Sequence, residues 1–282
     1  MERDTYADAT LLLVGHGSTV NAASAAPVYA HTESLRQRRL FAGVEPCFWL
    51  QEPRLAAVRR SVRTARLFVV PLFLSEGYFT QEILPRELGL ATAAPGGVHR
   101  PHQADAQRLY YCRPVGTHPD MTGVVLARAS AVVRQHPFPR PPQPSETTLF
   151  LAGHGTERHE KSRQAVEHHA AWLRERTDYA DVQGVFLEES PRVNECWQLA
   201  ATQSIVVVPF FLSDGLHANE DIPTLLGEPE AVVRARLASG QPTWRNPTER
   251  GGKRLWYASG VGLDPLVVEV ILARVRESAA GA

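Results

Sequence analysis

The chain lacks the features that mark disulfide-stapled and membrane-spanning proteins. Its 282 residues include only three cysteines, Cys47, Cys112 and Cys196, which are odd in number and widely separated. This spacing argues against a disulfide scaffold and against a C-x-x-C metal or iron–sulfur site. The longest apolar run, 205–212, is interrupted by a proline, whereas a membrane helix needs about 20 apolar residues. We therefore expect no membrane association.

An excess of charge of either sign is also missing. Thirty basic residues balance thirty acidic ones, so a polyanion partner such as nucleic acid is not expected. Lysine is scarce, since only Lys161 and Lys253 occur; the other cations are arginines, which suit bidentate carboxylate contacts. Residues 1–134 carry 15 basic and 11 acidic residues, and residues 135–282 carry 15 basic and 19 acidic residues.

The N-terminus shows no basic region followed by an apolar one, which is the pattern of a signal peptide, so we expect a cytoplasmic protein.

The chain repeats its own sequence. Three blocks return 138 residues later and a fourth returns 146 residues later. The pairs are 11–18 with 149–156, Phe48 and Pro53 with Phe186 and Pro191, 69–75 with 207–213, and 108–119 with 254–265. An insertion in the polar stretch 240–252 accounts for the change of offset. Four blocks in the same order indicate an internal duplication.

A proline-rich stretch lies between the two copies. Residues 135–144 read QHPFPRPPQP, and proline at this density prevents helices and sheet ladders. We therefore predict two domains, 1–134 and 148–282, joined by an extended linker at 135–147. We expect a monomer in which the two domains pair about an internal pseudo-two-fold axis.

Each copy alternates short β-branched runs with helical stretches. In the second copy we predict strands at 148–152, 182–187, 204–211 and 254–259, with helices at 163–176, 191–203, 222–238 and 265–277. Alternating strands and helices indicate parallel strands joined by right-handed crossovers, with helices on both faces. The predicted fold class is α/β, with two tandem doubly wound domains of four parallel strands each.

Three polar residues of the second copy follow neighbouring strands. His154 lies between two glycines after the first strand, Glu188 ends the second, and His217 follows the third. Ligands of such sheets bind beyond the carboxyl ends of the strands. Two neutral imidazoles and a carboxylate suit a borderline divalent metal. The competing interpretation is a hydrogen-bonded turn histidine and a solvated Glu188. His159, His168 and His169 are expected at the surface, on an exposed helix or just before it.

The duplication provides an internal control for this site. The first copy keeps His16 but has Leu50, Phe79 and Ile83 where the second has Glu188, His217 and Asp221. Residues needed for structure should persist in both copies, whereas a site needed once can survive in one. This pattern favours one working metal site in the second copy and a degenerate counterpart in the first, where the role of His16 stays open.

The motifs of the second copy resemble those of the class II chelatases. The strand followed by Gly-His-Gly-Thr at 153–156, the Phe-Leu-Glu at 186–188, and the segment 207–223 carry the resemblance. The closest likeness is to the sirohydrochlorin chelatases of the CbiX type and their ferrochelatase relatives. The resemblance implies a chelatase-like fold in two lobes, a tetrapyrrole substrate, and ATP-independent insertion of a divalent metal. It maps the family's two histidines onto His154 and His217 and its acidic residue onto Glu188, as metal-binding and catalytic residues.

Several alternatives remain open from the sequence. A non-catalytic tetrapyrrole or metal carrier would keep the same binding residues, and a siroheme ferrochelatase would differ only in its metal. Co²⁺ is favoured, but Fe²⁺ and Ni²⁺ also suit imidazole and carboxylate ligands. A histidine phosphatase is disfavoured because glycine, not arginine, precedes His16 and His154. A dinucleotide enzyme is disfavoured because no G-x-G-x-x-G follows a strand, and we expect no organic cofactor.

Overall fold

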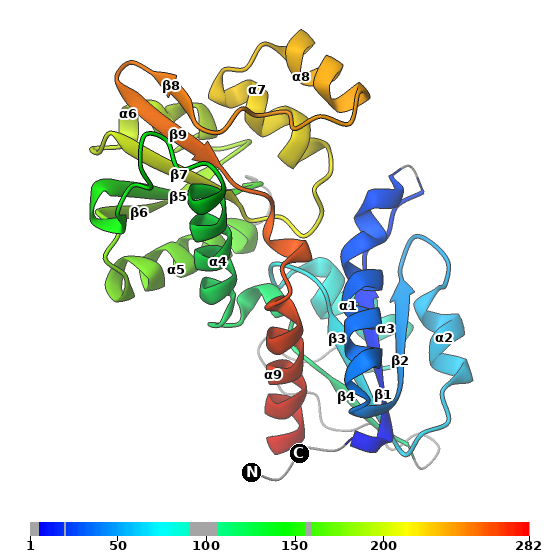
Figure 1. The fold of residues 1–282 in the computed structure, drawn as a ribbon. Helices are drawn as coiled ribbons and strands as arrows, with labels where there is room; N and C mark the ends of the chain where they lie inside the picture. The colour runs from blue at the N-terminus through cyan, green and yellow to red at the C-terminus, as the bar shows by residue number, and fades with distance from the viewer. Residues whose placement is uncertain (1–5, 20, 91–106, 156–159, 282) are drawn as a thin grey trace. The chain divides into compact units, whose positions relative to one another are not determined.

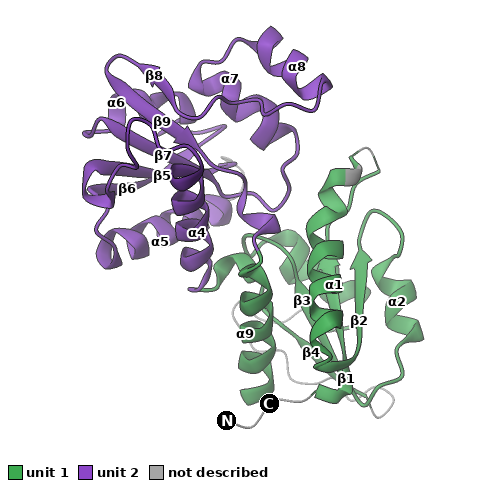
Figure 2. Ribbon diagram, viewed as in Figure 1, with its two compact units in different colours: residues 1–118, 265–282 green, residues 119–264 purple. Residues whose placement is uncertain are grey.

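The chain forms two α/β units (Figure 1). The computed structural model describes residues 6–19, 21–90, 107–155 and 160–281. Unit 1 comprises residues 1–118 and 265–282, and unit 2 comprises residues 119–264 (Figure 2). Both contain a parallel sheet covered by helices, as the alternation of strands and helices predicts.

Unit 1 contains a four-stranded parallel sheet in the order β2-β1-β3-β4. The strands are β1 (Tyr6–Gly15), β2 (Phe41–Phe48), β3 (Arg66–Pro71) and β4 (Arg108–Tyr111). The helices are α1 (Ala26–Arg38), α2 (Leu55–Ser61), α3 (Leu84–Glu87) and α9 (Val267–Ala280), with the short turns η1 (Ala22–Ala25), η2 (Phe79–Ile83) and η3 (Val115–Thr117). Helices α1 and α9 contact each other and the sheet. Side chains of α2 and α3 pack into an apolar core with alternate residues of β1 and β3.

Unit 2 contains the parallel order β6-β5-β7-β9, with β8 added antiparallel at the β9 edge. The strands are β5 (Thr147–Gly153), β6 (Asp181–Phe186), β7 (Ser204–Pro209), β8 (Thr248–Arg250) and β9 (Lys253–Tyr257). The helices are α4 (Met121–Gln135), α5 (Glu160–Arg176), α6 (Cys196–Leu199), α7 (Ile222–Leu226) and α8 (Glu230–Ala238), with the turns η4 (Pro144–Glu146), η5 (Val193–Glu195), η6 (His217–Asp221) and η7 (Val261–Leu263). Helices α4 and α5 contact each other and the sheet, while α6 and α7 join a core that includes Phe150 and Val207.

The two units exchange their last helices. Helix α4 follows β4 of unit 1 along the chain but belongs to unit 2, where it contacts β7 and β9. Helix α9 follows β9 of unit 2 but contacts β3 and β4 of unit 1. The compact units therefore differ from the predicted domains 1–134 and 148–282, although the segment 136–143 between α4 and η4 is irregular, as its prolines predict.

The repetition explains why the exchange is invisible in the sequence. The buried residues of α4 are Met121, Val124, Val125, Ala129 and Val132. At the offset of 146 their counterparts are Val267, Val270, Ile271, Val275 and Ser278 of α9, which are all buried too. Helices with equivalent buried faces fit equivalent positions on either sheet, so periodicity alone does not say which sheet each one covers.

Two predicted helices of the second copy differ in detail from the structure, and the sheet has one additional strand. The predicted helix 222–238 is two helices, because Gly227 adopts φ 109° and Pro229 follows it. The predicted helix 191–203 contains only η5 and α6. The polar insertion supplies β8, a fifth strand that the sequence did not predict. The expectation for His169 was wrong: this residue is 1% exposed, because it lies on the inner face of α5 beside the ring of Phe210. His168 is exposed, as expected, and His159 lies outside the described residues.

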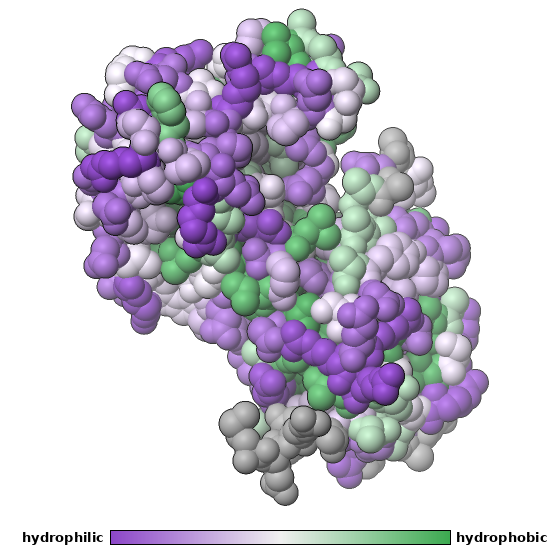
Figure 3. All heavy atoms as spheres, in the orientation of Figure 1, coloured by the Kyte–Doolittle hydropathy of each residue, from purple (hydrophilic) through white to green (hydrophobic). Residues whose placement is uncertain are grey.

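The surface is mainly polar in the view of Figure 3, with hydrophobic residues visible on the helix α8. Val232 and Leu237 of that helix are 37% and 38% exposed. Within the described part of the chain, every helix is too short or too polar to span a membrane.

Candidate functional site

The Gly-His-Gly turn after β5 is built by two different requirements on its glycines. A Cβ atom on Gly153 would lie 2.6 Å from Cγ2 of Val166, so α5 packs directly against the backbone there. Gly155 adopts φ 64°, a left-handed conformation that side chains disfavour. The same is true of Gly17 in unit 1, with φ 72°. The glycines are therefore structural in both copies, and they leave the histidine between them at the sheet edge.

His154 is held by a hydrogen bond to the turn itself. Its Nδ1 atom lies 2.9 Å from the carbonyl oxygen of Gly155. A carbonyl only accepts, so Nδ1 carries the proton in this geometry, and the Nε2 lone pair is available as a ligand. The side chain is 39% exposed, which leaves the ring accessible to a bound metal.

His217 reaches the same protonation pattern through a different partner. It begins η6, a one-turn π-helix that runs from His217 to Asp221. Its Nδ1 atom lies 2.6 Å from Oδ2 of Asp221, one helical turn onward. The carboxylate accepts a hydrogen bond from the Nδ1–H group, orients the ring and leaves the Nε2 lone pair available.

The structure brings the two imidazoles together. The ring centroids of His154 and His217 lie 5.0 Å apart and the rings are perpendicular. The ring of Phe211 lies 5.9 Å from that of His217 and supplies an apolar neighbour. Two exposed imidazoles with available Nε2 atoms at the carboxyl edge of β5 and β7 form the centre of the site.

Glu188 lies beside His154. Its Oε2 atom is 3.8 Å from Nδ1 of His154, and its side chain is 55% exposed. Among the described residues, no group of three or more His, Cys, Asp or Glu side chains is arranged to hold a metal ion. The three predicted residues are therefore neighbours, with only the two histidines in direct ring contact.

The cysteines take no part in the site. All three are buried, and burial raises the pKa of Cys112 to about 12 and raises the pKa of Cys47 and of Cys196 further. Thiols in this state are poor metal ligands because the thiolate is the ligand.

The equivalent edge of unit 1 is aromatic. His16 again places Nδ1 2.8 Å from the following glycine carbonyl, but its ring neighbour is Phe79, at a centroid distance of 4.7 Å. Trp49 lies 4.9 Å from Phe79 and 5.5 Å from His16. The neighbouring Tyr78 is 51% exposed. An aromatic cluster therefore stands where unit 2 has its pair of histidines.

Sequence reasoning missed two residues that support the site. Asp221 was noted only for its counterpart Ile83, although a carboxylate four residues after a histidine in a helical turn is a usable signal. Tyr257 lies at a position that the duplication preserves as Tyr111. Its hydroxyl group contacts the η6 turn that carries His217.

Duplicated parallel α/β units with paired histidines beyond the strands of one copy define a chelatase-like protein. The chain belongs to the CbiX family, because the model of that family matches it twice, over residues 10–132 and again over 148–278. The double match coincides with the internal duplication and spans most of the chain.

Two proteins named as sirohydrochlorin cobaltochelatases, one of them as probable, are similar in sequence to this chain. A probable sirohydrochlorin cobaltochelatase of Halobacterium salinarum is 38% identical over 280 residues, which cover 96% of this chain and 91% of that protein. A sirohydrochlorin cobaltochelatase of Methanopyrus kandleri is 34% identical over 138 residues, 46% of this chain and 95% of that protein.

A solved structure supports the fold over almost the whole chain. A multi-domain protein of Deinococcus radiodurans, described as structurally similar to chelatases, superposes with a TM-score of 0.75 at 33% identity. The match covers 94% of this chain but only 54% of that protein, which has two additional domains.

Proposed function

We propose that this protein inserts a divalent metal, with Co²⁺ preferred, into sirohydrochlorin or a similar polycarboxylate tetrapyrrole without using ATP. The observation that carries the proposal is the pair of adjacent imidazoles, His154 and His217, whose Nδ1 atoms are both engaged. The relatives named above support the choice of substrate. The chain is proposed to act as a monomer because it already contains two copies of the unit.

The proposed chemistry requires a metal that is bound but exchangeable. Two imidazole ligands from His154 and His217 hold a borderline divalent ion and leave other coordination positions for water and for the ring nitrogens. As the metal–nitrogen bonds form, two pyrrole N–H bonds break and two protons leave. Glu188, exposed beside His154, can accept the two protons one after the other and pass each to solvent.

The degenerate edge of unit 1 suits the organic substrate better than the metal. The aromatic cluster of His16, Trp49, Tyr78 and Phe79 offers ring surfaces to a flat conjugated macrocycle. Residues 1–134, which include all four strands of unit 1, carry 15 arginines and 11 acidic residues, and arginine recognises carboxylates. We propose that this half contributes to tetrapyrrole binding and the second half presents the metal.

The experiment is a metal panel with sirohydrochlorin. The full chain is incubated with Co²⁺, Fe²⁺ or Ni²⁺ under anaerobic conditions without ATP, and the loss of the metal-free absorption spectrum is followed above the rate without protein. Catalysis fastest with Co²⁺ is expected, and fastest turnover with Fe²⁺ would instead identify a ferrochelatase. Binding of metal and tetrapyrrole without turnover would overturn the enzyme and indicate a carrier.

A further inference from the structure

The turn that carries His217 contains a backbone carbonyl with no helical partner. In the π-helix η6, the N–H of Ile222 donates to the carbonyl of His217, five residues earlier. The next carbonyl, that of Ala218, would be served by residue 223, but this residue is proline and has no N–H. Ala218 is buried, with 3% exposure, and a buried carbonyl left without a donor would be costly.

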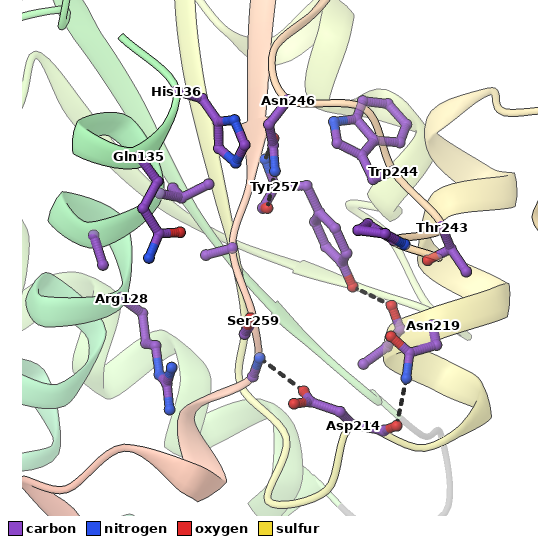
Figure 4. A pocket seen from close by; sticks show the side chains of 16 residues that line it. Arg128, Gln135, His136, Asp214, Asn219, Thr243, Trp244, Asn246, Tyr257 and Ser259 are labelled. Carbon is purple, nitrogen blue, oxygen red and sulfur yellow. Dashed lines mark hydrogen bonds between the residues drawn. The ribbon is translucent and has the colours of Figure 1, made fainter. Parts of the chain in front are cut away.

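Tyr257 supplies the missing donor. Its Oη atom lies 2.6 Å from the carbonyl oxygen of Ala218 (Figure 4). Burial raises the pKa of Tyr257, and the carboxylate of Asp214 adds to this effect, so the hydroxyl stays protonated and able to donate. The tyrosine extends from β9 and lines, with Ala218 and Asn219, a cavity of about 350 Å³.

Two further bonds fix the loop before the turn. The side-chain amide of Asn219 donates to the carbonyl of Asp214 at 2.5 Å, and the N–H of Gly260 donates to Oδ1 of Asp214 at 2.9 Å (Figure 4). Tyr257 and Gly260 both belong to the segment that runs from β9 into η7. The end of β9 therefore holds the His217 turn from its buried side.

Unit 1 repeats this arrangement without the histidine. Its π-helix η2 begins at Phe79, and the N–H of Leu84 donates to the carbonyl of Phe79. Pro85 leaves the carbonyl of Thr80 without a helical donor, and Oη of Tyr111 lies 2.7 Å from it. In both units the tyrosine hydroxyl therefore donates to the carbonyl that the proline leaves without a helical donor, although the turn begins with different residues.

We infer that Tyr257 is a positioning residue for metal binding, which holds the π-helical turn so that His217 faces both His154 and Asp221. The inference rests on the proposed metal-binding role of His217. Tyr257 acts only through the backbone, since its hydroxyl bonds to Ala218 and not to the imidazole. Tyr111 has the same structural task but orients no ligand, so it is the matched control.

The test compares Tyr257→Phe with Tyr111→Phe in the full chain. Each variant is titrated with Co²⁺ alone, followed by its visible absorption, and its thermal unfolding midpoint is recorded. Both midpoints should fall by similar amounts, because each variant leaves one buried carbonyl unpaired. Only Tyr257→Phe should weaken Co²⁺ binding, by up to about tenfold, the lower end of the loss seen when a direct hydrogen-bond partner of a metal ligand is removed, and it should alter the cobalt spectrum.

A double variant completes the design. Pro223→Ala restores a backbone N–H that can reach the carbonyl of Ala218, so Pro223→Ala with Tyr257→Phe should recover most of the Co²⁺ affinity, even if Tyr257→Phe alone does not fold. Unchanged Co²⁺ binding by Tyr257→Phe, equal weakening by Tyr111→Phe, or no recovery in the double variant would overturn the inference. Wild-type protein that binds Co²⁺ but never inserts it would overturn the proposed enzyme and leave the positioning role standing.

Discussion

The two copies of the π-helical turn have the same framework and different chemistry. In unit 2 the turn begins with His217, whose ring lies 5.0 Å from that of His154 at 90°. In unit 1 it begins with Phe79, whose ring lies 4.7 Å from that of His16 at 78°. The ring–ring geometry is nearly the same, yet only one pair offers two nitrogen ligands.

This comparison separates framework residues from chemical ones. Both copies keep the left-handed glycine after the histidine, the proline after the π-helix and the tyrosine that caps it. Glu188, His217 and Asp221 occur in one copy only. Features shared by both copies therefore maintain the turn, and features of one copy carry the proposed reaction.

The largest expected effect is on the histidine pair. His217→Ala or His154→Ala removes a nitrogen ligand and should lower the rate of metal insertion more than about 100-fold, beyond the loss typical of an outer partner. Phe79→Ala, at the position equivalent to His217, should leave kcat within about twofold and raise KM for the tetrapyrrole. The assay is the loss of the metal-free sirohydrochlorin spectrum. A fall in kcat for Phe79→Ala as large as that for His217→Ala, with both variants folded, would contradict the asymmetry.

The second comparison concerns two fragments that share the site. Residues 119–264 keep α4 on their own sheet, whereas residues 148–282 lack it. Four of the buried side chains of α4 are methionine or valine. At about 1.5–3 kcal/mol each as an upper range, their burial rivals the whole stability of a domain, about 5–15 kcal/mol. We expect fragment 119–264 to unfold cooperatively and bind Co²⁺ but bind sirohydrochlorin poorly.

Fragment 148–282 should melt far lower, or self-associate so that α9 of one copy replaces the missing α4 of another. Circular dichroism melts and size-exclusion chromatography measure both properties. If 148–282 were a monomer as stable as 119–264, the exchange of helices would not matter for folding.

A smaller effect is expected at the carboxylate behind His217. Asp221→Asn keeps an oxygen that can accept the Nδ1 proton but removes its charge, and should weaken Co²⁺ binding by about tenfold. Asp178→Asn, an exposed change in the same unit, is the control for lost surface charge. Calorimetric titration with Co²⁺ measures both variants, and equal affinities would show that Asp221 does not act on the imidazole.

The smallest effect separates the two glycine turns. Gly17→Ala and Gly155→Ala each force a side chain into a left-handed conformation, at a cost of about 1–2 kcal/mol in stability. Their unfolding midpoints should fall alike, but only Gly155→Ala, next to His154, should also weaken Co²⁺ binding. Denaturant unfolding and cobalt titration of both variants test this, and a loss of Co²⁺ affinity in Gly17→Ala would assign unit 1 a part in metal binding.

Much of the fold was predictable because the relevant forces are local. Strands such as β5 and β7 are continuous apolar runs, and the buried face of α5 recurs with a helical period. The break between α7 and α8 was missed because the helical pattern continues on both sides of Gly227. The strand β8 was missed because it lies in a polar insertion without an apolar run. His169 was placed on the wrong face of α5 because its charged neighbours were given more weight than its spacing, three residues after Val166 and four before Leu173 on the buried face.

For the candidate site, the sequence alone determined which residues belong together and in which copy. His154, Glu188 and His217 each follow a strand, and strand ends in a parallel sheet share one edge. Tertiary structure decided the rest: that the two imidazoles meet, that Asp221 orients His217, that Tyr257 supports the turn, and that the last helices are exchanged. These depend on side-chain directions and on which of two equivalent surfaces a helix covers. The periodicity of a repeated sequence encodes neither the side-chain directions nor the surface that a helix covers, because both copies have the same periodicity.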